Sequence, residues 1–200
     1  MARSLDTCKS VFDRARDLVK VYDGMEEDEK NKDLLRSSVV LAVSGFDRYF
    51  THRFTDILSS HLKRKNPSKE LIEVLERSGV NLAFVLKLAA QQKARPFRTI
   101  RNKVQPSLFR LTTQQTSEID KLFNKVGIHG LTGRVQSQCG KKLLIKRINH
   151  AVLRRHKIAH EGDLNSHYKP NDLSPNTVCK WIDALEEYVV IADGIVGEHE

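Results

Sequence analysis

The sequence predicts an all-α protein, folded as an up-and-down bundle of helices. In nearly every periodic segment the apolar residues recur at steps of three and four, which is the spacing of one helix face. No segment shows the alternation of a half-buried strand, and no internal repeat is visible. With 200 residues and 40% hydrophobic content, the chain is long enough to bury a core as one domain, residues 1–200.

Two long helices are expected at the start of the chain, over residues 4–22 and 30–64. Their apolar faces contain Leu5, Cys8, Phe12, Ala15, Leu18 and Val19 in the first, and Leu35, Val39, Ala42, Phe46, Phe50, Phe54 and Ile57 in the second. A short helix should follow, with Asn66 as its cap and Pro67 at its first position, and should end near Gly79. Asn81 is expected to cap the next helix, whose apolar residues are Leu82, Val85, Leu86 and Leu88.

The middle of the chain is predicted to be less regular. Pro96 and Pro106 bracket a basic connector, and a helix over residues 116–126 ends at Gly127. The four glycines between residues 127 and 140 predict a mobile surface loop, which lacks the GxxxxGKS or GxxxxGKT pattern of a nucleotide triphosphate loop. Residues 80–140 are therefore a candidate insert within the domain.

Two further helices complete the prediction. One runs over residues 141–161 and ends before Gly162, because glycine readily adopts the left-handed conformation that ends many helices. Ser174 caps the last helix, with Pro175 in its first turn. The apolar residues of this last helix form two adjacent series, Val178, Ile182, Leu185, Val189, Ala192 and Val196 in one and Trp181, Tyr188 and Ile195 in the other. The combined stripe is wide enough to face a second copy of the chain as well as the core.

Arg155 and His160 are the candidate catalytic residues. A guanidinium is a permanent cation suited to phosphate, and an imidazole gives or takes protons near neutral pH. Arg155 falls on the apolar stripe of its helix, which contains Leu144, Ile148, Ala151 and Ile158. A charge in that position must be paired, lie at an interface or line a cleft, so a structural ion pair is the alternative to a catalytic role.

The spacing of Arg155 and His160 sets a geometric condition on any site that uses both. Five residues turn an ideal helix through about 500°, so the two side chains point roughly 140° apart. A shared site therefore needs either an unwound helix end or a second copy of the helix across a twofold interface.

The stretch from Arg155 to His160, followed by Glu161-Gly162-Asp163 and one further amphipathic helix, resembles the signature of HEPN domains of the RiboL-PSP/MAE-like branch. Gly45-Phe46-Asp47-Arg48-Tyr49-Phe50 is also similar to the family, and the resemblance covers residues 35–62 and 140–196. It implies a dimeric all-α bundle of HEPN type with additional helices. It also implies a metal-independent endoribonuclease without a cofactor, in which an Arg-x4-6-His motif from each subunit lines a shared cleft. Several such proteins act as bacterial toxins or antiviral defence effectors.

The resemblance identifies Arg155 with the arginine of the family, His160 with its histidine, and His156 with the polar position after the arginine. It suggests Asp47 as an acidic residue that contacts Arg155. In the expected reaction the RNA 2′-hydroxyl attacks its own phosphate and leaves a 2′,3′-cyclic phosphate and a 5′-hydroxyl. His160 would move the protons, Arg155 would stabilise the developing charge, and His156 would orient the phosphate.

The charge distribution favours RNA as a partner. The net charge is +9 and the pI is about 9.5. Residues 93–110 contain six basic residues and no acidic one, residues 141–157 contain seven with none, and residues 181–200 contain six acidic residues and no Lys or Arg. If the two basic stretches share a surface, they form a track for RNA phosphates. The expected contacts are Arg154, Lys157, Lys146, Arg147, Arg101 and Lys103.

Other chemistries are less well supported. The three cysteines are far apart and form no CxxC pair, which argues against a disulfide framework or a zinc knuckle. His156 and His160 have the spacing of two zinc ligands, but Lys157 stands where such an enzyme carries its catalytic glutamate. No apolar run approaches the 18 residues of a membrane span. We expect a cytoplasmic protein that binds no metal and no membrane.

Two other functions remain open at the level of sequence. One is a non-catalytic HEPN-type module that binds RNA or a nucleotide and partners a nucleotidyltransferase-type antitoxin or a sensor protein. The other is a structural dimerisation module in which Arg155 and His160 form an ion-linked interface. Cleavage of RNA in EDTA would separate the ribonuclease from both.

Overall fold

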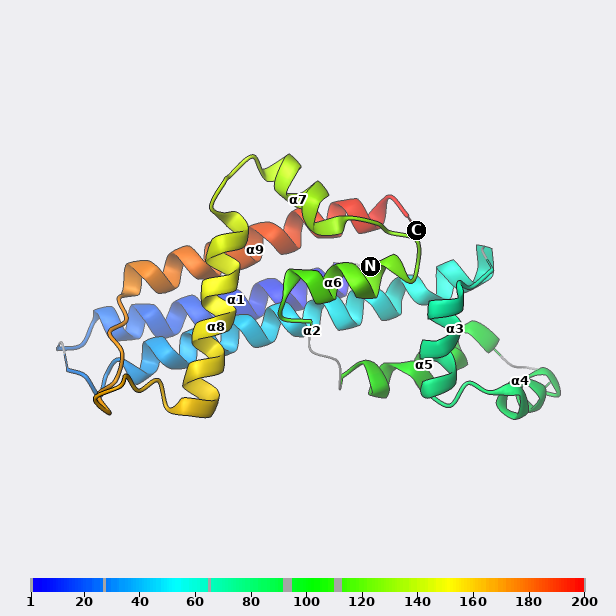
Figure 1. The fold of residues 1–200 in the computed structure, drawn as a ribbon, viewed down its shortest axis with the longest axis horizontal. Helices are drawn as coiled ribbons and strands as arrows, with labels where there is room; N and C mark the ends of the chain where they lie inside the picture. Colours follow the sequence, from blue (N-terminus) through cyan, green and yellow to red (C-terminus); the bar gives the residue numbers. More distant parts are fainter. Residues whose placement is uncertain (1, 27, 65, 92–94, 110–112, 200) are drawn as a thin grey trace.

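The computed structural model describes residues 2–26, 28–64, 66–91, 95–109 and 113–199. This part of the chain contains nine helices and no β-strand, so the predicted all-α class is confirmed (Figure 1). The helices are α1 (Ala2–Asp23), α2 (Asp33–Arg64), α3 (Lys69–Arg77), α4 (Leu82–Ala89), α5 (Pro96–Leu108), α6 (Thr116–Asn124), α7 (Leu131–Cys139), α8 (Leu144–Glu161) and α9 (Pro175–Gly197).

Three long helices form the body of the molecule. α1, α2 and α9 run along its long axis, and α8 crosses them (Figure 1), where it contacts α2 and α9. Aromatic rings fill the centre, with Phe50 of α2 lying 5.0 to 6.0 Å from Phe46, Phe123 and Tyr188 between ring centroids. The apolar faces predicted for α1, α2 and α9 are buried or half-buried. The helical period alone therefore identified the helices that support α8.

A glycine allows α1 and α2 to approach closely. Gly45 lies inside α2, and a Cβ atom placed there would stand 2.7 Å from Cγ1 of Val11 on α1. Val11 is β-branched and stiff, so it cannot easily move aside. The two helices consequently pack backbone to side chain at this point.

The structure corrects the predictions for α3 and α5. The cap of α3 is Ser68, not Asn66, because the Ser68 hydroxyl accepts a hydrogen bond from the Leu71 amide. The predicted connector is helix α5, which begins at Pro96 and contains Pro106 in its last turn. Its buried residues Val104 and Leu108 pack into the core, and this packing outweighs the hydrogen bond that Pro106 lacks.

The predicted glycine-rich loop contains a helix. Gly130 and Gly140 adopt left-handed conformations, with φ of 60° and 67°, and bracket α7. Leu131 and Val135 of α7 are fully buried, and α7 packs against α9. The glycines therefore act as helix boundaries, which composition alone does not distinguish from a loop.

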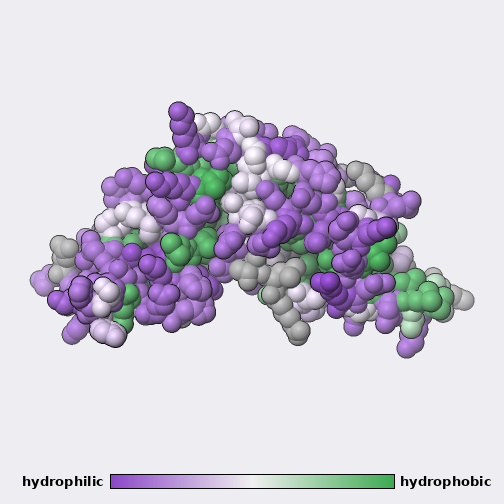
Figure 2. Space-filling view, in the orientation of Figure 1, coloured by the Kyte–Doolittle hydropathy of each residue, from purple (hydrophilic) through white to green (hydrophobic). Residues whose placement is uncertain are grey.

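Helix α4 exposes much of its apolar surface at one end of the molecule. Asn81 caps it as predicted, through a hydrogen bond from the Phe84 amide. Leu82 and Leu86 are 74% and 61% exposed, and a green area lies over α4 at the lower right of Figure 2. None of the described helices combines the length and apolar character that a bilayer crossing requires.

A Gly45→Ala substitution tests the close approach of α1 and α2. We expect it to lower the free energy of unfolding by about 1–3 kcal/mol, because the added methyl overpacks against Val11. Gly133→Ala is the control, since that glycine lies in α7 with open space around it, and it should stabilise the protein by about 0.5–1 kcal/mol. Urea denaturation measures both. A Gly45→Ala protein as stable as the wild type would show that the helices do not meet this closely.

Candidate functional site

The helix that carries the candidate catalytic residues stays regular to its end. α8 continues as an α-helix through Glu161, and Gly162 ends it with φ of 62°. The amide of Asp163 then donates to the carbonyl of Lys157 at 3.1 Å, which closes the last turn. The end of α8 is therefore not unwound, and Arg155 and His160 of one chain diverge as an ideal helix requires.

A buried carboxylate holds the end of α8 against α2. Asp163 is fully buried, and its two oxygens lie 3.0 Å from Nε of Arg36 on α2 and 2.8 Å from Nε of Arg154 on α8. Burial by itself opposes the charge on Arg36, but bonds to Glu29, Asp163 and Asp33 outweigh it and raise the pKa of Arg36 above its usual value. This cluster fixes the direction in which the last turns of α8 point.

The cluster gives Arg154 a structural role that limits the predicted RNA contact. Besides its ion pair with Asp163, Arg154 donates to the carbonyls of Asn171 and Asp172, both at 2.9 Å. These bonds join α8 to the segment that leads into α9. Nε and Nη2 are engaged in this way, so Arg154 has a structural role, and its predicted RNA contact could use only Nη1.

Arg155 has no such partner. Its side chain is half-buried and its Nε is shielded from solvent, yet it forms no hydrogen bond or ion pair with any described residue. The structural ion pair considered from the sequence is therefore not found in this part of the chain. Only Nε is shielded, so the rest of the guanidinium stays accessible, without a counterion, to an anion or a second chain.

The two histidines of the motif form an exposed pair. His156 and His160 both lie on the solvent side of α8, and their ring centroids are 4.6 Å apart. The side chains of Lys146, Arg147 and Lys157 on the same helix form no ion pair with described residues. α8 therefore presents imidazoles and unpaired cations together on its outer surface.

Asp47 does not contact Arg155 in the structure. Its carboxylate accepts hydrogen bonds from the Thr113 amide, the Thr113 hydroxyl and the Gln114 side chain. It thereby anchors the start of the segment before α6 to α2. The acidic residue that pairs with the motif helix is Asp163, which contacts Arg154 of α8 and Arg36 of α2 but not Arg155. Arg36 lies 127 residues away, and helical spacing does not reveal such a contact.

The remaining predicted RNA contacts lie elsewhere. Arg101 and Lys103 belong to α5, which packs on the opposite end of α2 from α8 (Figure 1). Lys93 and Arg110 of the first basic stretch lie outside the described residues. The two basic stretches therefore belong to separate parts of the molecule and do not form one compact site. Among the described residues, no three His, Cys, Asp or Glu side chains are grouped as a metal site would require.

Comparison with protein-family models decides the family. The RiboL-PSP-HEPN model matches residues 9–198, which includes the central region that the sequence resemblance did not cover. The chain belongs to the RiboL-PSP-HEPN family. Comparisons with curated proteins and with solved structures found no match. The candidate active site of this HEPN protein is therefore the end of α8, which carries Arg155 and His160.

Adjacent arginines provide a matched test of these assignments. Arg154→Ala should lower the free energy of unfolding by about 2–3 kcal/mol, because it removes the ion pair with a buried carboxylate and two charged hydrogen bonds to backbone carbonyls. Arg155→Ala should change it by less than about 1 kcal/mol, since no partner among the described residues is lost. Chemical denaturation of both variants checks the pair. Equal losses would mean that Arg155 is also a structural ion-pair residue.

Proposed function

We propose that this protein is a metal-independent endoribonuclease that cleaves RNA by attack of the 2′-hydroxyl on the adjacent phosphate. The observation that carries the proposal is that the last turns of α8 carry both an unpaired guanidinium, Arg155, and two exposed imidazoles, His156 and His160. Membership of the HEPN family supports it, because the chain retains the Arg-x4-His motif. Such a nuclease needs no metal or cofactor for cleavage, so it can act as soon as it is released from a partner. This property suits a toxin or antiviral defence effector that an antitoxin or sensor protein restrains.

Each residue has a defined task in this reaction. One His160 takes the proton from the 2′-hydroxyl, and the 2′-oxygen bonds to phosphorus. Negative charge grows on the non-bridging oxygens, where Arg155 stabilises it. The bond to the 5′-oxygen then breaks, and a second histidine donates a proton to that leaving oxygen. The products are a 2′,3′-cyclic phosphate and a 5′-hydroxyl, and no water is consumed.

The geometry of α8 favours two copies of the chain at one site. Arg155 and His160 diverge in a regular helix, so two motif helices facing across a twofold axis are needed to surround one phosphate. Apolar surface suited to such contact lies nearby. Leu153 is 56% exposed, and a cleft of about 680 Å³ beside the end of α8 is lined in part by Leu18, Val40, Leu41 and Ile158. A second copy could cover both.

The first functional prediction concerns His160. The wild type should cleave single-stranded RNA in EDTA and leave cyclic phosphate ends, and His160→Ala should reduce the rate by about 10²–10⁴-fold. Its melting temperature should not change, because the side chain is exposed. His167→Ala, an exposed histidine in the loop after α8, is the control and should keep full activity. Products with 5′-phosphate ends, or a strict requirement for Mg²⁺, would instead indicate another mechanism or a non-catalytic module.

Subunit mixing tests the shared cleft. Wild-type and His160→Ala chains are combined under conditions in which subunits exchange, and activity is measured per total protein. If one His160 from each subunit serves each phosphate, activity should fall as the square of the wild-type fraction. A linear fall would show that each chain carries an independent site. Sedimentation of the same mixtures shows whether dimers are present.

A further inference from the structure

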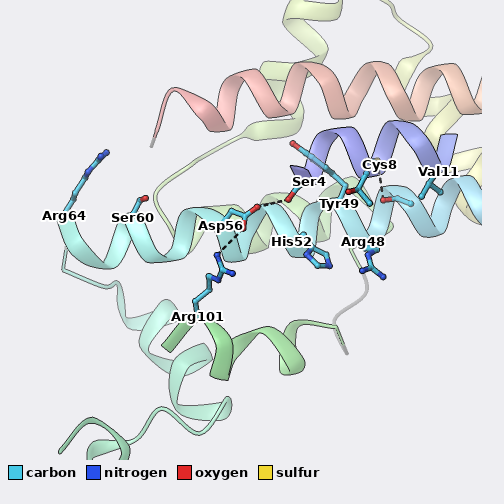
Figure 3. A pocket seen from close by; sticks show the side chains of 12 residues that line it. Ser4, Cys8, Val11, Arg48, Tyr49, His52, Asp56, Ser60, Arg64 and Arg101 are labelled. Carbon is cyan, nitrogen blue, oxygen red and sulfur yellow. Dashed lines mark hydrogen bonds and ion pairs between the residues drawn. The ribbon is translucent and has the colours of Figure 1, made fainter. Parts of the chain in front are cut away.

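A second groove has a volume of about 860 Å³. It is formed by the first turns of α1, the C-terminal half of α2 and α5 (Figure 3). Its lining includes Ser4, Arg48, His52, Asp56 and Arg101. The proposed ribonuclease mechanism uses none of these side chains.

The groove contains more positive than negative charge. Three arginines line it, Arg48, Arg64 and Arg101, and Asp56 is its single acidic lining residue among those described. The carboxylate of Asp56 is already occupied, since Ser4 Oγ donates to it at 2.8 Å and Nη1 of Arg101 lies 3.6 Å away. Arg48 and Arg64 form no ion pair with described residues. The groove can therefore accept an anion without displacing a native partner from Arg48.

His52 lies between two of these cations. Figure 3 shows Arg48 and His52 on the same side of α2, with Arg101 reaching toward that helix from α5. Nε2 of His52 is shielded from solvent and has no hydrogen-bond partner, and neither does Nε of Arg101. Burial lowers the pKa of His52, and the charges of Arg48 and Arg101 lower it further, while Asp56 acts in the opposite direction. His52 and Arg101 thus both line the groove, and each has one shielded nitrogen without a hydrogen-bond partner.

We propose that this groove binds phosphate groups, and that an RNA strand carries them. Guanidinium groups bind phosphate oxygens through paired hydrogen bonds, and Arg48 and Arg101 approach from two different helices. Arg64 lies 16 residues from Arg48 on α2 and points to the other side of that helix in Figure 3, so Arg48 and Arg101 form the centre of the proposed site.

An aromatic ring supports RNA as the carrier. Phe109 is 53% exposed, and its ring centroid lies 5.3 Å from that of His52. Exposed rings beside a basic groove stack on the bases of single-stranded RNA. The groove would then hold a part of the substrate remote from the cleaved bond. This inference rests on the proposed function only in its choice of RNA; the phosphate chemistry is independent of cleavage.

Binding of a 2′-O-methyl RNA oligonucleotide tests the proposal. Such RNA has no free 2′-hydroxyl, so affinity can be measured on the full chain by fluorescence anisotropy whether or not the protein is a ribonuclease. Arg48→Ala should weaken binding about tenfold, because a charged hydrogen bond is lost, and should reduce the slope of log affinity against log salt by about 0.7. Arg101→Ala should have a similar effect. Arg77→Ala, an arginine exposed on α3 and outside the groove, is the matched control and should bind as the wild type.

Competition identifies the source of the phosphate. Inorganic phosphate and AMP are added to the same assay with wild-type and Arg48→Ala protein. If RNA is the carrier, both compete only weakly, whereas strong competition by AMP that Arg48→Ala abolishes would overturn RNA in favour of a nucleotide. Unchanged RNA affinity in both Arg48→Ala and Arg101→Ala, or an equal loss in Arg77→Ala, would overturn the site itself. Absence of ribonuclease activity in separate cleavage assays would count against the proposed function and leave this binding result intact.

Discussion

The position of the candidate site depends on the burial of one carboxylate. Asp163 has no exposed surface, and it occupies a left-handed backbone conformation, with φ of 59°, directly after the glycine that ends α8. A charge in such a place is tolerated only when it is paired and hydrogen-bonded, and here guanidiniums from α2 and α8 both reach it. The side chain of Asn171 also donates to its backbone carbonyl at 2.8 Å. Movement of the end of α8 would break all of these bonds together.

This cluster separates two neighbouring arginines into different roles. One residue step turns an α-helix by about 100°, so Arg154 and Arg155 point in different directions. Arg154 pairs with Asp163 and donates to the carbonyls of Asn171 and Asp172. Arg155 lies on the apolar stripe of α8, near its C-terminal end, and has no counterion among the described residues. The rigid pairing of the first leaves the second oriented but unneutralised, which is the state in which a cation can stabilise an anionic transition state.

The sequence was sufficient for elements whose evidence is local. The period of Phe46, Phe50 and Phe54 predicts the buried face of α2, and the Ser174-Pro175 pair predicts the start of α9. Prediction was wrong where packing between distant segments overrides a local signal, as at Pro106 inside α5 and at the glycines that bracket α7. Asp47 illustrates the same limit within the site. Its partners Thr113 and Gln114 lie 66 and 67 residues away, and helical spacing carries no information about such a contact.

The acidic last helix determines which cations remain available for an anionic ligand. On α9, Glu186 pairs with Arg16, Glu187 with Lys141, Asp193 with Arg53, and Glu198 belongs to the same series through Arg134. These carboxylates neutralise basic residues of α1, α2 and α7, and also Lys141, which lies just before α8. By contrast, no ion pair with a described residue is formed by Arg48 of α2 or by four cations of α8, which are Lys146, Arg147, Arg155 and Lys157. Part of the net charge of +9 is therefore carried by unpaired cations along α8 and in the groove beside α5, where RNA phosphates would encounter it. These two regions lie at different parts of α2, so an RNA strand that contacts both must extend along the molecule. Contacts to phosphates do not read the bases, so such a surface would select RNA by strand length before base identity.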